Sequence, residues 1–483
     1  MTRETKNKKI SLTDNNYNKE ERVPWSGKIF NNLKDIAQKD LSSPDLLVFP
    51  SSIDDTEINA DTHIIELIQD SEEETNKKVC KIRTGNIMGF VGKDNVHLRI
   101  HSRFDDMSNE GGKEPKGNFL YYMLSKVLNI NLTSLETTTS AKDSILNLLF
   151  MFFPKVLKEA LAQGLYKEYR YFQYNDDRVR GAIEVSRFIR EDIPFRGKIA
   201  YRTRELSHNN NLLHLVRHTI EYLRSNSFGR GILNNDLDTR NAILQVVNVT
   251  PDYQLRDRRR IIQCCTQLIN HPFYTKYRAL QKLCLSILRH ERVMSGEDND
   301  KGYGLLFDGA WLWEEYLNTL LEPLNFIHPE NKKGQGGINL FDTTPHHTIY
   351  PDFYKEGQIV ADAKYKRYAK DENGNKREVA REDLYQIITY MYRLNIKKGL
   401  FLCPSVCKEE FVTPYKIGDS DATIEVIGLS IPQNAKLHFR DFCTEMRNNE
   451  YNLQGRSRTT RNLIALQWKL IVTACTKQAE YYL

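Results

Sequence analysis

Long apolar runs are absent from this sequence of 483 residues. A membrane-spanning helix needs roughly 18 consecutive apolar residues, and no stretch approaches that length. The first residues, Met1 to Lys9, are polar and basic and lack the apolar segment of a secretory signal. We therefore expect a cytoplasmic protein with no membrane partner.

Paired cysteine motifs are also missing. The eight cysteines are scattered along the chain. Cys264 and Cys265 are adjacent in an apolar, helix-like run, and Cys403 and Cys407 form a single C-x3-C without a second pair. A zinc site or a disulfide framework needs more ligands or more pairs than this. The thiols are therefore expected to be free in a reducing compartment.

A third absence is the phosphate-binding motif G-x4-G-K-[ST]. The Gly-Lys pairs at 92–93, 112–113 and 197–198 lack the residues that flank it in nucleotide-binding loops. We expect this chain to bind no nucleotide itself, so any nucleotide hydrolysis must come from a partner protein.

The charge is modest overall but unevenly distributed. The net charge is +6, with 40% apolar and 10% aromatic residues, as in a globular protein. Residues 54–75 hold nine acidic and no Lys or Arg side chains, whereas residues 256–292 hold nine Lys or Arg and two acidic ones. The basic stretch suits a polyanion such as DNA. The alternative for both stretches is a solvated face.

The length and the changes of hydrophobic pattern predict several domains. Residues 1–20 are polar without periodicity, which is typical of a flexible tail. Short apolar runs between Gly and Asp turns predict a β-rich domain over residues 21–115. Helical spacing then predicts a mainly helical middle domain over residues 116–300. An α/β domain over residues 301–430 and a helical extension over residues 431–483 complete the chain.

Within the α/β domain we expect the order α-β-β-α-β. The elements expected are a helix that Asp308 caps and that runs through Leu321, strands at Thr348–Tyr354 and Gln358–Tyr365, a helix at Glu382–Leu394 and a strand at Gly399–Cys403. A further amphipathic, basic helix is expected at Thr460–Ala474.

The two expected strands carry a pair of acids and a lysine. Gly357 lies midway between Asp352 and Asp362, so a hairpin turn there brings the two carboxylates opposite one another. Cross-strand Cβ atoms lie about 4.5 to 5.5 Å apart. Carboxylates at this distance can share Mg²⁺ or Mn²⁺. Lys364 follows two residues later on the same face, where it can orient the attacking water and offset charge on the transition state.

The combination is more informative than its parts. Acid-x-Lys also occurs at Glu4, Glu114 and Glu330, but only Pro351-Asp352 is followed by such a tripeptide within a hairpin. The residues together fit the PD-(D/E)xK motif of metal-dependent nucleases. The alternative is an exposed hairpin with a salt-bridged Asp-Lys pair.

Residues on the flanking helices support the site. Glu314 shares a helix face with Leu317 and Leu321, which directs it inward. Gln386 and Tyr390 lie on a polar line beside the apolar stripe of the next helix, within reach of a substrate phosphate or of Lys364. The alternative is that these two side chains belong to a solvated helix face.

These segments resemble the McrC family, the nuclease subunits of the McrBC 5-methylcytosine-specific restriction systems. The resemblance rests on Leu312-Trp-Glu314-Glu-Tyr-Leu, Tyr350-Pro-Asp352, Ala361-Asp362-Ala-Lys364 and Asp383-Leu-Tyr-Gln386-Ile-Ile-Thr-Tyr390, and upstream on Gly89-Phe-Val-Gly92, His97 to Phe104, Val179 to Glu184 and Glu205 to Leu213. One departure is His101-Ser102, where the family usually has Pro-Lys after the Ile, which leaves the geometry of this loop open.

The resemblance implies an α+β multidomain protein whose C-terminal domain is a restriction-endonuclease-like PD-(D/E)xK core. Glu314, Asp352 and Asp362 would be the acidic residues that hold Mg²⁺, Lys364 the catalytic lysine, and Gln386 and Tyr390 its support. The chain would be a type IV restriction endonuclease subunit that cleaves double-stranded DNA with modified cytosine.

The resemblance also implies a partner. McrC-like proteins act with a McrB-like AAA+ GTPase, onto which the N-terminal and helical domains would dock. Two other hypotheses remain open at this point. One is a nuclease of DNA repair or recombination on the same core, and the other is a non-catalytic adaptor that stimulates an AAA+ motor.

Overall fold

A computed structural model gives the fold. It describes residues 8–16, 21–24, 27–39, 41, 46–49, 64–71, 78–93, 96–105, 117–129, 141–294, 303–329, 334–341, 347–367, 379–406, 412–434 and 437–455. The helix expected at residues 460–474 and most of the acidic stretch 54–75 lie outside these ranges. Within them, no helix is long and apolar enough to cross a membrane.

The chain forms two compact units. The first contains Met1–Ser42, Val48–Thr137 and Gly304–Leu483, and the second contains Ser43–Leu47 and Thr138–Tyr303. The first unit is therefore assembled from both ends of the sequence, and the second is inserted into it.

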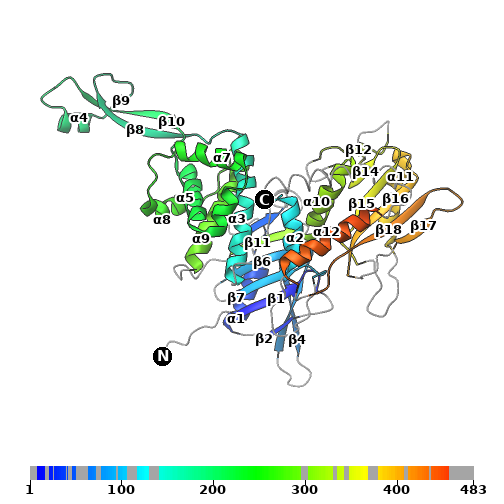
Figure 1. Cartoon of the computed structure of the whole chain (residues 1–483). Coiled ribbons are helices and arrows are strands. Elements are labelled where there is room, and N and C mark those ends of the chain that lie inside the picture. The colour runs from blue at the N-terminus through cyan, green and yellow to red at the C-terminus, as the bar shows by residue number, and fades with distance from the viewer. Residues whose placement is uncertain are drawn as a thin grey trace. The chain divides into compact units, whose positions relative to one another are not determined.

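The N-terminal part of the first unit is built on two sheets (Figure 1). A five-stranded sheet has the order β1-β7-β6-β11-β3, and a three-stranded antiparallel sheet has the order β2-β5-β4. Their strands, with the helix α1 at Lys28–Ala37, are β1 Lys8–Thr13, β2 Glu21–Pro24, β3 Leu46–Phe49, β4 Ile65–Ser71, β5 Lys78–Thr84, β6 Ile87–Lys93, β7 Val96–His101 and β11 Tyr303–Asp308.

Two expectations about this part were wrong. The flexible tail expected over residues 1–20 contains β1, which pairs in parallel with β7 and buries Ile10 and Leu12. Two buried side chains are too few to give a recognisable alternation in the sequence. The β-rich domain, expected to end at residue 115, also includes β11, a strand that begins only at Tyr303.

The C-terminal part of the first unit is an α/β layer. Its main sheet has the order β14-β15-β16-β18-β17, in which β15, β16 and β18 run parallel. The elements are α2 Asn118–Val127, α10 Gly309–Leu321, η4 Glu322–Leu324, β12 Ile338–Asn339, β13 Thr348–Ile349, β14 Phe353–Lys355, β15 Ile359–Ala363, α11 Arg381–Leu394, β16 Lys398–Ser405, β17 Val412–Lys416, β18 Thr423–Ser430 and α12 Phe439–Gly455.

From α10 to β16 this layer departs from the predicted order α-β-β-α-β in one respect. The strand expected at Thr348–Tyr354 is divided into β13, which pairs with β12 in a separate two-stranded sheet, and β14, which begins only at Phe353. Pro351 lies between the two and has no backbone N–H to donate to a ladder. Asp308 caps α10, since its side chain accepts hydrogen bonds from the backbone N–H groups of Ala310 and Trp311. The helix α2 was expected in the helical middle domain but belongs here. Its Tyr122 shares the buried carboxylate of Glu450 on α12 with Tyr316 on α10.

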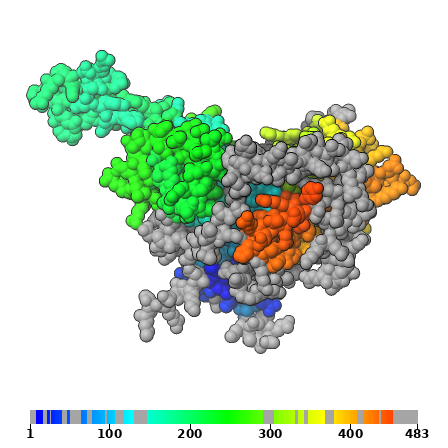
Figure 2. All heavy atoms as spheres, in the orientation of Figure 1, coloured from blue at the N-terminus to red at the C-terminus, as the bar shows by residue number. Residues whose placement is uncertain are grey.

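The second unit is a helical body with an extended arm (Figures 1 and 2). The arm, residues 168–207, consists of β8 Glu168–Asp176, β9 Ala182–Ile183, α4 Val185–Glu191 and β10 Ile199–Ser207. The body consists of α3 Ala141–Ala162, α5 Asn211–Ser225, α6 Ser227–Leu233, α7 Leu237–Asn248, η3 Leu255–Asp257, α8 Arg258–Cys264 and α9 Lys276–Met294. The expectation of a mainly helical region holds for the body and missed the long strands of the arm.

The basic stretch 256–292 does not form one face. Its residues are spread over η3, α8 and α9, and Lys282 is buried within α9 at 4% exposure. The guanidinium of Arg258 lies over the ring of Tyr222, 5.7 Å from its centroid. The prediction of DNA contact therefore reduces to the exposed side chains of η3, α8 and the first turn of α9.

Gly89 provides a test of the five-stranded sheet. Its φ is +132°, and a Cβ there would lie 2.1 Å from the backbone oxygen of Leu305 on β11. We expect Gly89→Ala to lower the free energy of unfolding by about 2 kcal/mol or more, because the strands must separate and the backbone is strained. Thermal and urea unfolding measure the loss. Gly85→Ala is the control, since a Cβ there meets nothing within 4 Å, and equal effects of both changes would contradict the close approach of β6 and β11.

Candidate active site

The hairpin of β14 and β15 brings Asp352 and Asp362 together. The strands pair antiparallel with Phe353 opposite Ala361, so Asp352 comes opposite Asp362 at the next position. Gly357 makes the turn with a φ of +63°. The Oδ2 atom of Asp352 accepts a hydrogen bond of 2.7 Å from the backbone N–H of Ala363. The predicted juxtaposition of the two acids is therefore present in the structure.

Both faces of β15 are covered by other parts of the structure. Val360 and Ala361, which point to opposite sides, are both fully buried, and Asp362 is 1% exposed. The reason is that both α10 and α11 pack against the strand. Asp362 is thus removed from water as completely as the apolar residues beside it.

Burial sets the electrostatics of the acid pair. It is the largest cause of the raised pKa of Asp352, which lies well above its usual value, and the charges of Asp362 and Glu314 raise it further. Burial also raises the pKa of Asp362, although Lys364 opposes that shift. Two neighbouring carboxylates in such surroundings repel one another unless a proton or a cation lies between them.

Lys364 lies among three polar groups. Its Nζ atom is 2.6 Å from Oδ2 of Asp362 and 3.3 Å from Oδ1 of Asp383, and it donates a 2.9 Å hydrogen bond to Oε1 of Gln386. Burial alone would lower the pKa of Lys364, but Asp362 and Asp383 outweigh it and raise the pKa. The ammonium group is therefore charged and held toward the acid pair.

Gln386 and Tyr390 support this lysine from α11. Gln386 accepts a hydrogen bond from the lysine at its Oε1 atom and donates its own amide N–H to the hydroxyl of Tyr390 at 2.8 Å. Tyr390 in turn donates to the backbone oxygen of Tyr350 at 3.2 Å. Burial raises the pKa of Tyr390 to about 12, so its hydroxyl stays protonated and able to donate.

Glu314 lies at the edge of the site. Its side chain is 27% exposed, and its Oε1 atom is 3.9 Å from Nε2 of His328. His328 also contacts the backbone oxygen of Asp352 through Nδ1 at 2.7 Å and stacks on Phe353. Glu314 is thus close enough for its charge to raise the pKa of Asp352, but it is more exposed than the fully buried Asp362.

Two residues of this site were not predicted. Asp383 lies one turn before Gln386 on α11 and could have been found from the i, i+3 spacing that also relates it to the lysine's partner. His328 follows η4 in an irregular segment, where no spacing rule places a side chain.

The acid pair suits a divalent cation chemically. Carboxylate oxygens are hard ligands, and a cation would relieve the repulsion that raises both pKa values. Across the described ranges, however, no group of three or more His, Cys, Asp and Glu side chains is arranged to hold a metal ion. Asp352 and Asp362 are together, while Glu314 does not join them as a third ligand in this structure.

Comparison with known proteins assigns the chain to a family. Residues 82–403 match the family described as McrBC 5-methylcytosine restriction system component. The chain belongs to this family. The McrBC match includes the segment from Glu314 to Tyr390 that forms the site. No curated protein matched the sequence.

Two solved assemblies of Thermococcus gammatolerans are similar to this McrBC family member. One is a refined half-complex from the tetradecameric assembly of McrB AAA+ hexamers with bound McrC, at 14% identity, 92% coverage of this chain, 100% of that chain and a TM-score of 0.45. The other is the McrBC complex, at 16% identity, 67% coverage of this chain, 90% of that chain and a TM-score of 0.30.

The raised pKa of Asp352 predicts a pH-dependent stability. The folded state holds a proton on this carboxyl more tightly than the unfolded state, whose value is near 3.8, so stability falls as pH rises toward the folded pKa. Without divalent cations we expect Asp352→Asn to raise the thermal unfolding midpoint by about 3 °C near pH 8 and by less near pH 5. Asp421→Asn, an 84% exposed side chain, is the control. A difference from wild type that does not grow with pH would contradict the assignment.

Proposed function

We propose that this chain is the DNA-cleaving subunit of a GTP-dependent McrBC restriction complex. It hydrolyses phosphodiester bonds of double-stranded DNA that contains modified cytosine, on a PD-(D/E)xK core. The observation that carries the proposal is the pairing of Asp352 with the buried Asp362, and the place of Lys364 directly after β15, with its Nζ atom 2.6 Å from Asp362. These residues lie within the segment that matches the McrBC family.

The chain's own residues suggest how the reaction proceeds. Asp352 and Asp362 would hold Mg²⁺ or Mn²⁺, with Glu314 nearby as a third acid, and the cation would supply an activated water and offset charge on the phosphate. Lys364 is placed to orient an attacking water and to stabilise the charge that develops on the phosphate oxygens. Gln386 and Tyr390 keep the ammonium in place through their hydrogen bonds.

Substitution of Lys364 tests this proposal. With the AAA+ partner, GTP and Mg²⁺ present, we expect Lys364→Ala and Asp352→Ala to lower the rate of plasmid cleavage by about 10²-fold or more, because each removes charge stabilisation from the transition state. Gel assays on plasmid with modified cytosine measure the rate. Lys355→Ala is the control, since this lysine is on the same hairpin but contacts the backbone of Leu324.

Three outcomes would change the assignment. Normal cleavage by Lys364→Ala would remove this site from the reaction. If the wild-type chain stimulates GTP hydrolysis by the partner but never cleaves DNA, the non-catalytic adaptor is the better description. If it cleaves DNA equally with and without the partner and the modified base, a repair or recombination nuclease is favoured.

The partner in this proposal is a McrB-like AAA+ GTPase. The sequence has no phosphate-binding motif of its own, and in the Thermococcus gammatolerans assembly McrC is bound to McrB AAA+ hexamers. We propose that this chain assembles with such a ring and that the second unit takes part in the contact.

The arm is the surface that we assign to this contact. Tyr171 pairs with Arg204 across β8 and β10, and Tyr169 and Arg202 lie two residues away on the same face. Tyr171 is 68% exposed, and the guanidinium of Arg202 lies over its ring, 5.4 Å from the centroid. Tyr169 is 55% exposed, and the guanidinium of Arg204 lies over its ring, 4.4 Å from the centroid. Exposed aromatic and arginine side chains of this kind are typical of binding hot spots.

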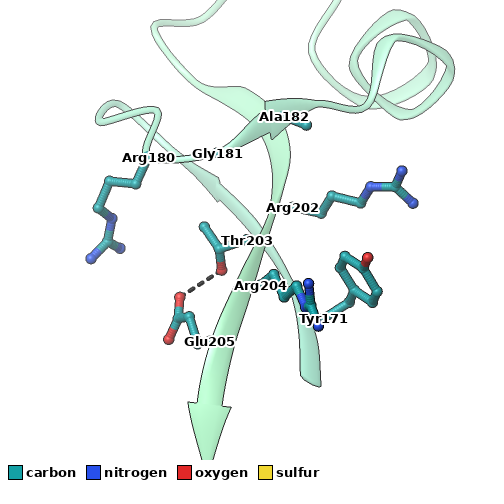
Figure 3. A pocket seen from close by; sticks show the side chains of 8 residues that line it. All are labelled: Tyr171, Arg180, Gly181, Ala182, Arg202, Thr203, Arg204 and Glu205. Carbon is teal, nitrogen blue, oxygen red and sulfur yellow. Dashed lines mark hydrogen bonds between the residues drawn. The ribbon is translucent and has the colours of Figure 1, made fainter. Parts of the chain in front are cut away.

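A hollow of about 420 Å³ lies beside this face (Figure 3). Two backbone segments approach each other closely at one side of the hollow, since a Cβ on Gly181 would lie 2.1 Å from the backbone oxygen of Arg202. The residues that line it are Tyr171, Arg180, Gly181, Ala182, Arg202, Thr203, Arg204 and Glu205. The hollow gives the arm a shape into which a partner's side chain can insert.

We expect Tyr169→Ser combined with Tyr171→Ser to weaken association with the AAA+ partner by about tenfold or more, because two exposed aromatic anchors are lost. Titration of the purified partner in GTP measures the affinity. Tyr451→Ser is the control, since Tyr451 on α12 is also 64% exposed but lies in the first unit. Undiminished affinity of the double variant would remove the arm from the interface.

A further inference from the structure

The chain leaves the catalytic strand through a buried tyrosine. β15 ends at Ala363, and the backbone N–H of Lys364 makes one more ladder bond, of 2.9 Å, to Leu402. The next residue, Tyr365, is 5% exposed. Successive side chains of an extended chain point to opposite sides. Lys364 therefore faces the acid pair while Tyr365 enters the N-terminal part of the same unit.

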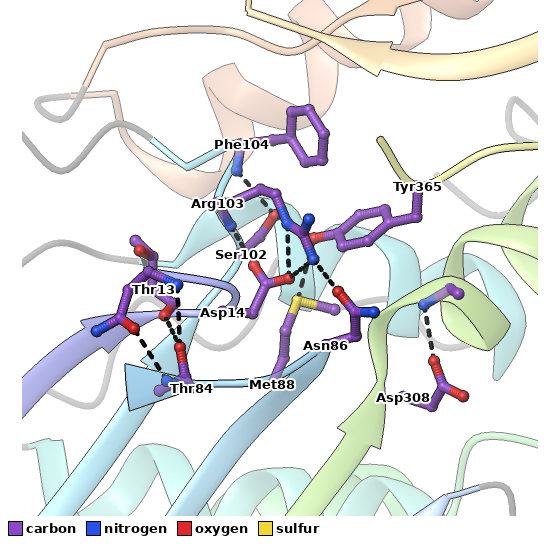
Figure 4. Close-up of polar contacts among 12 residues, drawn as sticks. Thr13, Asp14, Thr84, Asn86, Met88, Ser102, Arg103, Phe104, Asp308 and Tyr365 are labelled. Atoms are coloured by element: carbon purple, nitrogen blue, oxygen red, sulfur yellow. Dashed lines mark hydrogen bonds and ion pairs between the residues drawn. The ribbon is translucent and has the colours of Figure 1, made fainter. Parts of the chain in front are cut away.

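Tyr365 fits into a closed polar and aromatic site (Figure 4). Its hydroxyl is 2.7 Å from Oγ of Ser102 and 3.3 Å from Sδ of Met88. Its ring meets Phe104 edge-on at 5.1 Å, and the guanidinium of Arg103 lies 4.9 Å from the ring centroid. The loop Ser102-Arg103-Phe104, which we call the clamp loop, thus contacts the tyrosine through all three of its residues.

The start of α10 leaves room for this ring. A Cβ on Gly309 would lie 2.8 Å from Cε1 of Tyr365, so a glycine is needed at this position. The backbone N–H of Gly309 is itself bonded to the oxygen of Asn86 at 2.8 Å. The tyrosine site is therefore enclosed by the N-terminal sheet on one side and by the helix that carries Glu314 on the other.

The clamp loop is itself anchored. Arg103 donates through Nε to Oδ2 of the fully buried Asp14 at 2.8 Å and also contacts Asn86. The oxygen of Phe104 accepts a 2.9 Å hydrogen bond from Gln433. Arg367, two residues beyond Tyr365, donates to the backbone oxygen of Arg103. The segment that follows β15 thus contacts the clamp loop twice, through the side chains of Tyr365 and Arg367.

We infer that Tyr365 is a positioning residue for Lys364, and that the clamp loop sets the position of the lysine by holding the tyrosine. The side-chain end of Lys364 is fixed by Asp362 and Gln386. Its backbone end is fixed by Tyr365, one peptide unit away. Small displacements of a reacting group are costly in catalysis, so loosening the backbone end slows cleavage even though Tyr365 does not reach the substrate.

This inference rests on the proposed nuclease function and extends it. The clamp loop coincides with the departure from the family pattern noted in the sequence, where His101-Ser102 stands in place of Pro-Lys. The hydroxyl of Ser102 is the group that contacts Tyr365. The contribution of this contact can be measured by removing single oxygen atoms.

The experiment compares Tyr365→Phe, Ser102→Ala and the double variant in the full complex with partner, GTP and Mg²⁺. We expect each single change to lower the cleavage rate at saturating DNA by about 3- to 10-fold, the size expected for one hydrogen bond. Half-saturating DNA concentration should stay unchanged. Because both changes remove the same contact, the double variant should be no slower than the slower single variant. Ser102→Thr keeps the hydroxyl and should restore the rate.

Tyr316→Phe is the matched control. It removes another buried tyrosine hydroxyl in the same unit, which donates to Glu450 on α12 at 2.6 Å and not to the clamp loop. We expect a similar change of unfolding temperature for Tyr316→Phe and Tyr365→Phe, and a slower cleavage rate for Tyr365→Phe alone.

Two results would overturn the inference and leave the proposed function in place. These are wild-type cleavage rates in both Tyr365→Phe and Ser102→Ala, or additive losses in the double variant, while Lys364→Ala remains inactive. If Tyr316→Phe slows cleavage as much as Tyr365→Phe, the tyrosine acts through general stability only. If the wild-type chain does not cleave DNA, the proposed function and this inference fail together.

Discussion

The site depends on two carboxylates that lie next to one another, one of which is fully buried. Asp352 and Asp362 come together because the hairpin of β14 and β15 pairs them, and Asp362 is removed from water because α10 and α11 pack against β15. Lys364, whose Nζ atom is 2.6 Å from Asp362, and the backbone N–H of Ala363, which donates to Asp352, moderate the repulsion between the two acids. A fold that needed only stability would place apolar residues here, so the acids point to chemistry.

The two units divide the work in the proposed complex. The first holds the cleavage site and a backbone clamp on its lysine, whereas the second presents an arm whose side chains have little burial of their own. The sequence lacks the phosphate-binding motif G-x4-G-K-[ST], so in the proposed complex the hydrolysis of GTP belongs to the partner.

The sequence predicted the parts of the fold that depend on neighbours along the chain. Gly357 predicted the turn of the hairpin, and Asp308 predicted the start of α10. The apolar residues spaced three and four positions apart predicted the bounds of α11 to within one residue. The contact of Ser102 with Tyr365 joins residues 263 positions apart, and no local pattern encodes it. The arm was missed because its strands bury almost no side chains, so they lack the alternation by which strands are recognised.

The strand β11 also constrains how the protein can be made. It takes its place beside β6 in the N-terminal sheet, although the whole span Thr138–Tyr303 of the second unit lies between the two strands in the chain. During synthesis the edge of β6 that pairs with β11 stays unpaired until this span has left the ribosome. The helical body, whose contacts are local, can fold in that interval.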